Sequence, residues 1–393
     1  AMLKTGKYRF RCLGGAVKHR DYNPVKVDPY GDDWMIWPVD GYGNQDIVRN
    51  FIAHNKPDIL WFMTDPRFYG WLWEIENEIR ATVPLVYYHV WDNYPYPDFN
   101  KIWYESNDVI ATISKVTSDI VKNVSPSTKE VYLPHAVNTD VFRKISAPEI
   151  QDFKKESFKA IKNIEDKMIF FWNNRNARRK QSGSLIWWFK EFLNQVGHDK
   201  AMLLMHTDPH DPHGQDLLRI MNRLGLTNGE VMISSQKVPP EHLSMIYNVV
   251  DCTINISDAE GFGLATFESL ACETPIIVTM TGGLQEQVTD GVNWFGYGIE
   301  PTSKAVIGSQ DVPYIYEDRI NQEVFVDALV KFYNTPKEER DLMGKLGRKH
   351  LLDNYSMQSF AKKWEKVLDD VVENCGSWDT RKNYQSWELR EIK

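Results

Sequence analysis

One stretch of the chain, residues 252–280, constrains the fold more than any other. In order, it contains an apolar run, an acidic tripeptide, a glycine turn, a helical pattern and a second apolar run: residues 252–256, 258–260, 261–263, 264–272 and 275–280. This order predicts a βαβ unit whose turn lies at the carboxyl end of its first strand. Such a turn directs backbone N–H groups and a helix N-terminus toward a crevice, where anions bind well.

Two glutamates belong to this unit. Glu260 and Glu268 are eight residues apart, which is a little over two helical turns, so their carboxylates are expected close to one face. One would lie at the mouth of the crevice and the other two turns further along. The alternative is a helix of a parallel sheet whose carboxylates are merely solvated.

The residues around these glutamates resemble the signature of the retaining glycosyltransferases of the GT-B fold, family 4. That signature is Glu-x7-Glu, with a Gly-Phe-Gly-like turn after the first Glu and a Gly-Gly pair after the next strand. The matching residues are Glu260, Gly261, Phe262, Gly263, Glu268, Ala271, Pro275, Gly282, Gly283 and Glu286. The resemblance implies a hexosyltransferase-type enzyme (EC 2.4) that moves a sugar from a nucleoside diphosphate sugar to an acceptor hydroxyl with retained configuration.

The resemblance also implies roles for individual residues. Glu268 would accept both ribose hydroxyls of the donor, and Glu260 would touch the hydroxyls of the sugar near the reacting centre. Backbone N–H groups from Phe262 to Leu264 would contact the sugar or phosphate, and Val238 lies where the family makes backbone contacts to the base. The expected donor-binding residues are Glu268, Gly261, Phe262, Gly263, Leu264 and Val238.

A basic segment follows the first predicted strand of the second half. Arg175 and Lys180 resemble the Gly-Arg-x4-Lys of the family, whose Arg and Lys bind the donor pyrophosphate. Cations are needed there because negative charge grows on the diphosphate as the glycosidic bond breaks. Asn174 replaces the glycine, and asparagine tolerates the same left-handed backbone. The alternative is an ordinary basic loop.

A histidine completes the expected catalytic group of Glu260, Arg175, Lys180 and His89. His89 follows an apolar run that predicts a buried strand, and it resembles the family histidine that faces the donor sugar. The alternative is a core or capping histidine.

Metal binding is not expected. Three histidines and two aspartates fall within residues 206–213, but their spacing is not a tetrahedral zinc pattern, and Pro209 and Pro212 predict a turn. The resemblance likewise implies no metal, and no cofactor other than the nucleoside diphosphate sugar as donor substrate.

Glu273 departs from the family pattern. It stands where the family has the glycine that ends the helix with positive φ. We therefore expect a strained residue or a rebuilt helix end at this position.

Two alternating series of strand and helix patterns predict an α/β protein with two doubly wound, Rossmann-like domains. The resemblance implies that these domains face a central cleft, as in GT-B enzymes. We expect an acceptor-side domain over residues 1–165, a nucleotide-sugar-binding domain over 166–355, and a helix and tail over 356–393 that cross back to the first domain. Residues 296–316 show no clear period and are expected to form a loop. The strands of the second domain are expected at residues 168–172, 201–206, 231–234, 252–256 and 275–280.

The amino-terminal segment allows two interpretations. Residues 7–14 alternate as a strand does and end at Gly14-Gly15. These glycines either form the loop that GT-B enzymes place after their first strand, or the first βα unit is absent and this is a later strand. We favour the second interpretation, in which part of the acceptor side is missing.

The same segment is rich in cations. Seven Lys or Arg residues lie between Lys4 and Lys26, against one acid, Asp21. They suggest an anionic acceptor, such as a lipid phosphate, an anionic glycan or DNA, and peripheral contact with a membrane is compatible with that hypothesis. A solvated strand edge is the simpler interpretation.

Composition limits the remaining possibilities. The net charge of −8 argues against a general nucleic-acid coat, and no apolar run reaches the roughly 20 residues of a membrane span. We expect no signal peptide from the first residues, and the four scattered cysteines are typical of a reduced, cytoplasmic protein. A GT-B epimerase or phosphorylase, or a non-catalytic nucleotide-sugar or polyanion-binding protein, remains an alternative function.

Overall fold

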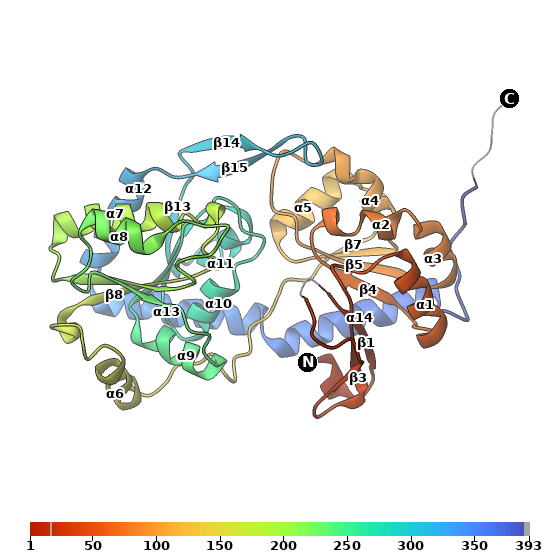
Figure 1. The fold of residues 1–393 in the computed structure, drawn as a ribbon, viewed down its shortest axis with the longest axis horizontal. Helices are drawn as coiled ribbons and strands as arrows, with labels where there is room; N and C mark the ends of the chain where they lie inside the picture. The colour runs from red at the N-terminus through yellow and green to blue at the C-terminus, as the bar shows by residue number, and fades with distance from the viewer. Residues whose placement is uncertain (16–17, 389–393) are drawn as a thin grey trace. The chain divides into compact units, whose positions relative to one another are not determined.

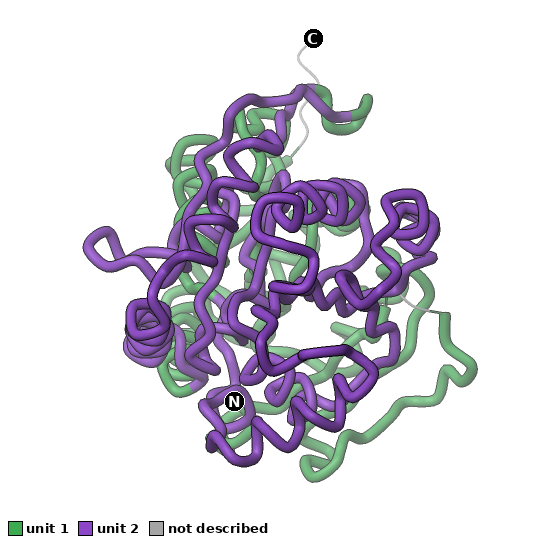
Figure 2. The backbone as a smooth tube through the Cα atoms, turned by 90° about the vertical axis from the view of Figure 1, so that its left-hand side faces the viewer, with its two compact units in different colours: residues 1–134, 309–313, 358–393 green, residues 135–308, 314–357 purple. Residues whose placement is uncertain are grey.

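The computed structural model describes residues 1–15 and 18–388. The chain divides into two compact units (Figure 2). Unit 1 comprises Ala1–Pro134, Ser309–Pro313 and Gln358–Lys393, and unit 2 comprises His135–Gly308 and Tyr314–Met357. Both units combine helices with parallel strands, which confirms the predicted α/β class.

Unit 2 is built on a six-stranded sheet in which every ladder is parallel (Figure 1). Its spatial order is β10-β9-β8-β11-β12-β13. Counted from β8, this is the order 3-2-1-4-5-6 of Rossmann folds, which bind ligands outside the strand ends where the order reverses. The strands are β8 (Met168–Asn173), β9 (Ala201–His206), β10 (Val231–Ser234), β11 (Cys252–Asn255), β12 (Ile276–Thr279) and β13 (Gly296–Ile299).

Helices bury this sheet. Because they pack on it, its strands are continuous apolar runs rather than alternating ones. Phe170 of β8 packs against Phe189 and Phe192 of α7 and against Phe332 of α12, and all four rings are fully buried. The helices of unit 2 are α6 (Ala147–Ser157), α7 (Ser182–Val196), α8 (Leu217–Leu224), α9 (Pro240–Val249), α10 (Leu264–Ala271), α11 (Gln285–Val288), α12 (Gln322–Asn334) and α13 (Lys337–Asn354).

The expected loop over residues 296–316 is wrong. The structure has strand β13 there, followed by the antiparallel hairpin of β14 (Ser303–Ile307) and β15 (Ile315–Arg319) (Figure 1). The hairpin lacks an apolar period because the face that carries Ile315 continues with the charged residues Glu317 and Arg319. Hydrophobic periodicity therefore could not reveal it.

Unit 1 contains two sheets, with orders β1-β3-β2 and β4-β5-β6-β7. The four-stranded sheet is wholly parallel, and β1 is parallel to β3 while β2 is antiparallel to it. The strands are β1 (Phe10–Gly14), β2 (Val25–Val27), β3 (Gly31–Pro38), β4 (Leu60–Met63), β5 (Leu85–His89), β6 (Val109–Thr112) and β7 (Glu130–Tyr132). The helices are α1 (Gln45–Asn55), α2 (Gly70–Trp73), α3 (Glu76–Thr82), α4 (Lys101–Glu105), α5 (Lys115–Val124) and α14 (Met357–Cys375).

Short 3-10 helices connect several of these elements. They are η1 (Met2–Thr5), η2 (Pro66–Phe68), η3 (Asp98–Asn100), η4 (Ile164–Asp166), η5 (Arg178–Lys180) and η6 (Gly282–Leu284). Among the helices of residues 1–15 and 18–388, none has both the length and the apolar character that a membrane span requires.

The glycine pair after β1 lies in a close approach of two backbones. A Cβ atom on Gly15 would overlap the carbonyl oxygen of Gly41, in the turn after β3. Glycine at position 15 thus lets the carboxyl ends of two parallel strands come together. Both interpretations of the amino-terminal segment are compatible with this contact.

Helix α14 belongs to unit 1 although it follows unit 2 in sequence. Its Trp364 ring meets the rings of Trp61 on β4 and Tyr88 on β5, with centroids 5.6 and 5.2 Å away. Asp369 pairs with Lys7 near the amino terminus. The helix is therefore held both by apolar contact and by an ion pair.

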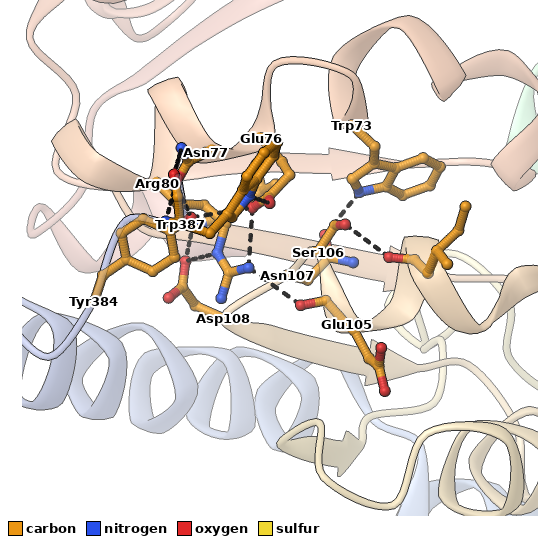
Figure 3. A network of polar contacts seen from close by, with 12 residues as sticks. Trp73, Glu76, Asn77, Arg80, Glu105, Ser106, Asn107, Asp108, Tyr384 and Trp387 are labelled. Carbon is orange, nitrogen blue, oxygen red and sulfur yellow. Dashed lines mark hydrogen bonds and ion pairs between the residues drawn. The ribbon is translucent and has the colours of Figure 1, made fainter. Parts of the chain in front are cut away.

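A partly buried polar network links the tail after α14 to the rest of unit 1 (Figure 3). Arg381 donates to Asp108 at 2.6 Å and to the carbonyl oxygen of Arg80 at 2.6 Å. Arg80 also pairs with Asp108, and the side chains of Asp108 and Arg381 are each only 7% exposed. Further hydrogen bonds reach α3, among them those from Tyr384 Oη to Asn77 Oδ1, from Trp387 Nε1 to Glu76 Oε1, and from Asn77 Nδ2 to the carbonyl oxygen of Trp387.

Glu273 has the expected strained backbone. Its φ is +62°, and it follows Cys272, the residue that caps α10. The N–H of Thr274 donates to the carbonyl of Ser269 and the N–H of Glu273 to that of Leu270, which is the Schellman pattern that normally ends in glycine. The helix end is thus preserved, and the strain falls on Glu273.

Replacing Glu273 with glycine is expected to stabilise the protein by about 0.5–1 kcal/mol, because glycine adopts positive φ without steric cost. Glu273→Ala is the matched control, since it removes the same carboxylate but keeps a Cβ. Denaturant unfolding of both variants measures the difference. Equal stability of the two variants would show that the backbone carries no such strain.

Candidate active site

Two loops leave the sheet of unit 2 at the point where its strand order reverses. The β8 loop (residues 174–181) follows β8, and the β11 loop (residues 256–263) follows β11 and leads into α10. The two strands are parallel neighbours, so both loops begin at the same edge of the sheet. Ligands bind at this edge in open α/β sheets.

Hydrogen bonds join the two loops directly. The N–H of Asp258 donates to the carbonyl oxygen of Arg179 at 2.8 Å, and Arg179 Nη1 donates to the carbonyl oxygen of Ala259. Gln181 Nε2 donates to Asp258 Oδ2 at 2.7 Å. These contacts hold the basic segment against the glutamate motif.

At the centre of this contact, Lys180 and Glu260 form a direct ion pair between Nζ and Oε2. Their side chains are only 9% and 12% exposed. Burial acts to raise the pKa of Glu260, but the charges of Lys180 and Arg179 outweigh it, so that pKa lies below its ordinary value. Glu260 is therefore a carboxylate at neutral pH, and the structure brings two predicted catalytic residues together.

The glycine pair after β12 accommodates the backbone of Glu260. The N–H of Gly283 donates to the carbonyl oxygen of Glu260 at 2.9 Å. A Cβ atom on Gly282, whose φ is +48°, would overlap that same oxygen. The Gly-Gly part of the motif is thus required because two turns approach each other closely, and this approach fixes the position of the Glu260 backbone.

Glu268 lies on α10 and is linked to the end of β8. Tyr247 Oη of α9 donates to Glu268 Oε2 at 2.9 Å and accepts from Asn173 Nδ2 at 2.9 Å. Burial raises the pKa of Glu268 to about 7, although the bond from Tyr247 acts in the opposite direction. Its carboxyl group is thus poised to change its charge near neutral pH.

Arg175 pairs with an acid from the histidine-rich turn. Its Nε and Nη2 donate to the two carboxylate oxygens of Asp211 at 2.6 and 3.1 Å, and the side chain is 61% exposed. That hydrogen bond lowers the pKa of Asp211. Arg175 is consequently held on the β8 loop with its guanidinium near solvent.

Asn174 does not use the left-handed backbone that asparagine tolerates, and positive φ occurs instead at Gln181 at the end of the same loop. There, φ of +57° immediately precedes α7 and lets the chain turn into that helix. The backbone freedom of the family glycine is therefore not used at position 174.

The remaining predicted donor-binding positions lie at the same edge of the sheet. The glycine of the turn, Gly263, has φ of +93° and immediately precedes Leu264, the first residue of α10, whose first backbone N–H groups have no acceptor within the helix. The Phe262 ring packs on those of Phe267 and His135. Val238 is half-buried in the connection from β10 to α9.

No group of three or more His, Cys, Asp and Glu side chains suited to a metal ion occurs in the part of the chain that the structure describes. In the histidine-rich turn, His206 Nδ1 instead contacts Ser234 Oγ at 3.0 Å. Asp211 is engaged by Arg175, as described above.

His89 lies in the core of unit 1. Its Nδ1 is 2.9 Å from Tyr87 Oη and its Nε2 is 2.7 Å from Tyr104 Oη. Since Tyr87 donates its hydroxyl proton to the carbonyl oxygen of Thr64, it must accept from a protonated Nδ1. Burial lowers the pKa of His89 to about 3, so the ring is neutral. In this arrangement both ring nitrogens are engaged, and its contact with a donor sugar stays a prediction.

The basic run of unit 1 is partly neutralised by acids of the same unit. Lys7 pairs with Asp369, Arg9 with Asp33, and Lys26 with Asp32. Because β1 and β2 are the edge strands of their sheet and carry Arg11 and Lys26, the basic run also suits the simpler interpretation of a protected edge.

Several residues that shape this site carry no recognisable sequence pattern. Tyr247 and Asn173 orient Glu268, and Asp211 orients Arg175, from segments that are distant in sequence. The position of Asn173 at the carboxyl end of the strand before the β8 loop was the one available indication.

Replacing Lys180 with Met is expected to destabilise unit 2 by roughly 3 kcal/mol at pH 7, because it leaves the buried Glu260 with only the more distant Arg179, at 3.9 Å, to compensate its charge. In the wild type, the lowered pKa of Glu260 contributes stability above its unfolded pKa, and that contribution is lost as pH falls through the folded pKa. In the variant, burial instead raises the pKa, so stability falls as pH rises from 5 to 7.

Melting temperatures of the wild type and of Lys180→Met at pH 5 and pH 7 measure this difference. The double variant Lys180→Met/Glu260→Gln is the control, because it removes both charges and should recover most of the loss at pH 7. A destabilisation that is the same at both pH values would contradict the ionic role of Lys180.

Curated relatives match parts of this chain. The N-acetyl-alpha-D-glucosaminyl L-malate synthase of Bacillus anthracis is 21% identical over 68% of this chain and 61% of its own length. A GDP-mannose-dependent alpha-(1-6)-phosphatidylinositol monomannoside mannosyltransferase of Mycolicibacterium smegmatis is 26% identical over 47% of each chain. The chain thus spans less than two thirds of the length of either relative.

Solved structures and a family model complete the comparison. The fold is GT-B, shared with sucrose-phosphate synthase from Thermosynechococcus elongatus (TM-score 0.72, 16% identity, 95% of this chain and 91% of that one). Anabaena HepE in complex with UDP and glucose is also similar (TM-score 0.64, 12% identity, 87% of each chain). The model of the family described as glycosyl transferases group 1 matches residues 153–350, half of the chain, and the protein therefore belongs to that family.

Proposed function

We propose that this protein is a retaining glycosyltransferase that moves a sugar from a nucleoside diphosphate sugar to an acceptor hydroxyl. The observation that carries the proposal is the placement of Lys180 and Glu260 in contact at the reversal point of the unit 2 sheet. Family membership supports transfer of a glycosyl group. A GDP-mannose-dependent relative and a similar structure in complex with UDP and glucose support a nucleotide-sugar donor.

The proposed donor site uses the two loops and the start of α10. Lys180 and Arg175 would bind the diphosphate, whose two negative charges need nearby cations and backbone N–H groups. The N–H groups from Phe262 to Leu264 lie at the N-terminus of α10, where the helix dipole favours an anion. Lys180 would then share its charge between Glu260 and the phosphate.

The two glutamates have different proposed tasks because their environments differ. Glu260 is held ionised by Lys180 and would accept hydrogen bonds from the sugar hydroxyls near the anomeric carbon. Glu268, bonded to a single tyrosine hydroxyl, would accept both ribose hydroxyls, and Val238 would contact the base through its backbone.

The proposed chemistry is front-side substitution at the anomeric carbon. The bond from that carbon to the diphosphate oxygen breaks while the acceptor oxygen bonds on the same face. The departing phosphate takes the proton of the acceptor hydroxyl, so no side chain is needed as a strong base. Arg175 and Lys180 would stabilise the negative charge that develops on the phosphate.

The first test is whether the protein binds and uses a nucleotide sugar. At least one of UDP-glucose, GDP-mannose and ADP-glucose should raise the melting temperature. At a concentration of 100 times its dissociation constant, the nucleotide sugar that binds should increase the free energy of unfolding by about 2.7 kcal/mol. Arg175→Ala should then reduce donor hydrolysis or transfer by roughly 100- to 1000-fold, because a charge-stabilising donor is lost.

Arg49→Ala is the matched control, since it removes an exposed arginine of unit 1 that pairs with Glu78 and should leave turnover unchanged. Binding with neither hydrolysis nor transfer would instead identify a non-catalytic nucleotide-sugar-binding protein. If none of the three donors shifts the melting temperature, the proposal is contradicted for these donor classes.

Donor affinity should depend on pH through Glu268. Since the pKa of that carboxyl is about 7 in the free protein, and the carboxylate is the form that accepts two hydroxyls, affinity should rise about tenfold per pH unit up to pH 7 and then level off. Calorimetric titration with the nucleotide sugar between pH 5.5 and 8.5 measures this, because its diphosphate does not titrate in that range.

Glu268→Gln should bind more weakly and lose the pH dependence above pH 6.5. An unchanged profile in that variant would assign the titration to another group.

A further inference from the structure

Four charged side chains beside the two loops have no place in the proposed donor contacts. We call them the hairpin charge cluster: Arg178 of the β8 loop, Asp258 of the β11 loop, and Glu317 and Arg319 of β15. They bring the β14–β15 hairpin into contact with both loops of the candidate site.

Glu317 is the centre of the cluster. It accepts from Arg178 Nη1 and Nη2 at 2.9 and 2.8 Å and from Arg319 Nη2 at 3.1 Å. Arg319 Nη1 in turn contacts the carboxylate of Asp258. The side chains of Glu317 and Asp258 are 3% and 4% exposed, so both acids depend on the arginines for charge compensation.

Polar contacts on the intervening residue of β15 reinforce this arrangement. The N–H of Asp318 donates to the carbonyl oxygen of Asp258 at 3.0 Å, and Thr281 Oγ1 donates to Asp318 Oδ2 at 2.7 Å. Because side chains alternate along a strand, Glu317 and Arg319 share one face while Asp318 points the other way. Three consecutive residues of β15 thus hold the β11 loop and the turn after β12.

The spacing connects the cluster to the candidate site. Arg178 and Asp258 each stand two residues before Lys180 and Glu260, in the same two loops. The two arginines and two carboxylates of the cluster balance in charge. The planar guanidinium of an arginine fixes the orientation of a bound carboxylate more strictly than the ammonium of a lysine does. Because Arg178 and Asp258 are held in place, Lys180 and Glu260, two residues further along the same loops, have little freedom to move.

We propose that the β14–β15 hairpin is a positioning element of the donor site, in which Glu317 and Arg319 hold Arg178 and Asp258 and thereby set the position of Lys180 relative to Glu260. The inference rests on the proposed function, because it assigns these residues to the same donor site. Buried ion pairs contribute little net stability compared with apolar packing, whereas a binding site depends on side chains held within a fraction of an ångström.

The test is the isosteric variant Glu317→Gln, which keeps the size of the side chain and removes its charge. Its dissociation constant for whichever of UDP-glucose, GDP-mannose and ADP-glucose binds the wild type should rise on the order of tenfold or more, as misplaced binding groups predict. Titration calorimetry measures the affinity, and a melting curve of each protein measures its stability.

Asp108→Asn is the matched control. It is the same carboxylate-to-amide change at a buried acid bonded to two arginines, Arg80 and Arg381, but in unit 1. It should lower the melting temperature and leave donor affinity unchanged. If Asp108→Asn weakens donor binding as much as Glu317→Gln does, general destabilisation explains both and the proposal is overturned.

The pH profile of donor binding gives a readout that a purely structural role would not move. Burial raises the pKa of Asp258 to about 6, against the hydrogen bond from Gln181 and the charges of Arg319 and Arg178, while Glu317 acts in the same direction as burial. If the position of Lys180 depends on the charge of Asp258, donor affinity changes at the pH where Asp258 titrates. Glu317→Gln should shift that change in affinity to lower pH, because it removes a neighbouring negative charge, and Arg319→Gln should shift it to higher pH. Shifts in the same direction, or none, contradict the proposal.

The possible outcomes separate the two ideas. A wild type that binds a donor together with a Glu317→Gln variant that binds it equally well overturns the positioning role and leaves the proposed function intact. A wild type that binds none of the three nucleotide sugars overturns both. If Glu317→Gln does not fold, Arg319→Lys tests the same contact, because a single ammonium cannot bridge both acids as the guanidinium does, and wild-type affinity in that variant overturns the role.

Discussion

The adjacency of β8 and β11 is the constraint on which the candidate site of unit 2 depends. Two loops that are some 80 residues apart in sequence leave one sheet edge together, and only there can Lys180 and Glu260 compensate each other's charge. In a poorly solvated position either ion alone would be costly, whereas the pair is tolerated. The order of the strands in the sheet therefore determines which charged side chains come into contact in the candidate site.

Around that pair, the site is assembled from backbone geometry as much as from side chains. Glycine is required at position 282 because the carbonyl oxygen of Glu260 lies where a Cβ atom would stand, and at position 283 because the backbone of Gly261 and Phe262 lies there. The same turn receives the backbone of the β11 loop and donates to it through Gly283. The glycines of the motif are thus the means by which a carboxylate is held at a fixed depth beside a helix N-terminus.

Much of unit 2 could be predicted from sequence because its strands are buried on both faces. The observed bounds of β9 and β10 equal the predicted ones, and the α/β class and GT-B fold follow from the alternating pattern and the motif. The β14–β15 hairpin was missed because ion pairs replace apolar residues on its buried face. The partners Asp211, of Arg175, and Tyr247, of Glu268, were missed because long-range hydrogen bonds leave no local periodicity.

Unit 1 is assembled from separated stretches of chain, and this has a consequence for biosynthesis. Trp364 of α14 covers the apolar face of unit 1 at Trp61 and Tyr88. Arg381 of the tail forms an ion pair with Asp108. Ribosomes deliver domains from the amino terminus, and most domains close as they emerge. Here the first 134 residues and then almost all of unit 2 are synthesised before those covering residues exist. The aromatic face at Trp61 and Tyr88 therefore stays uncovered until translation has passed α14.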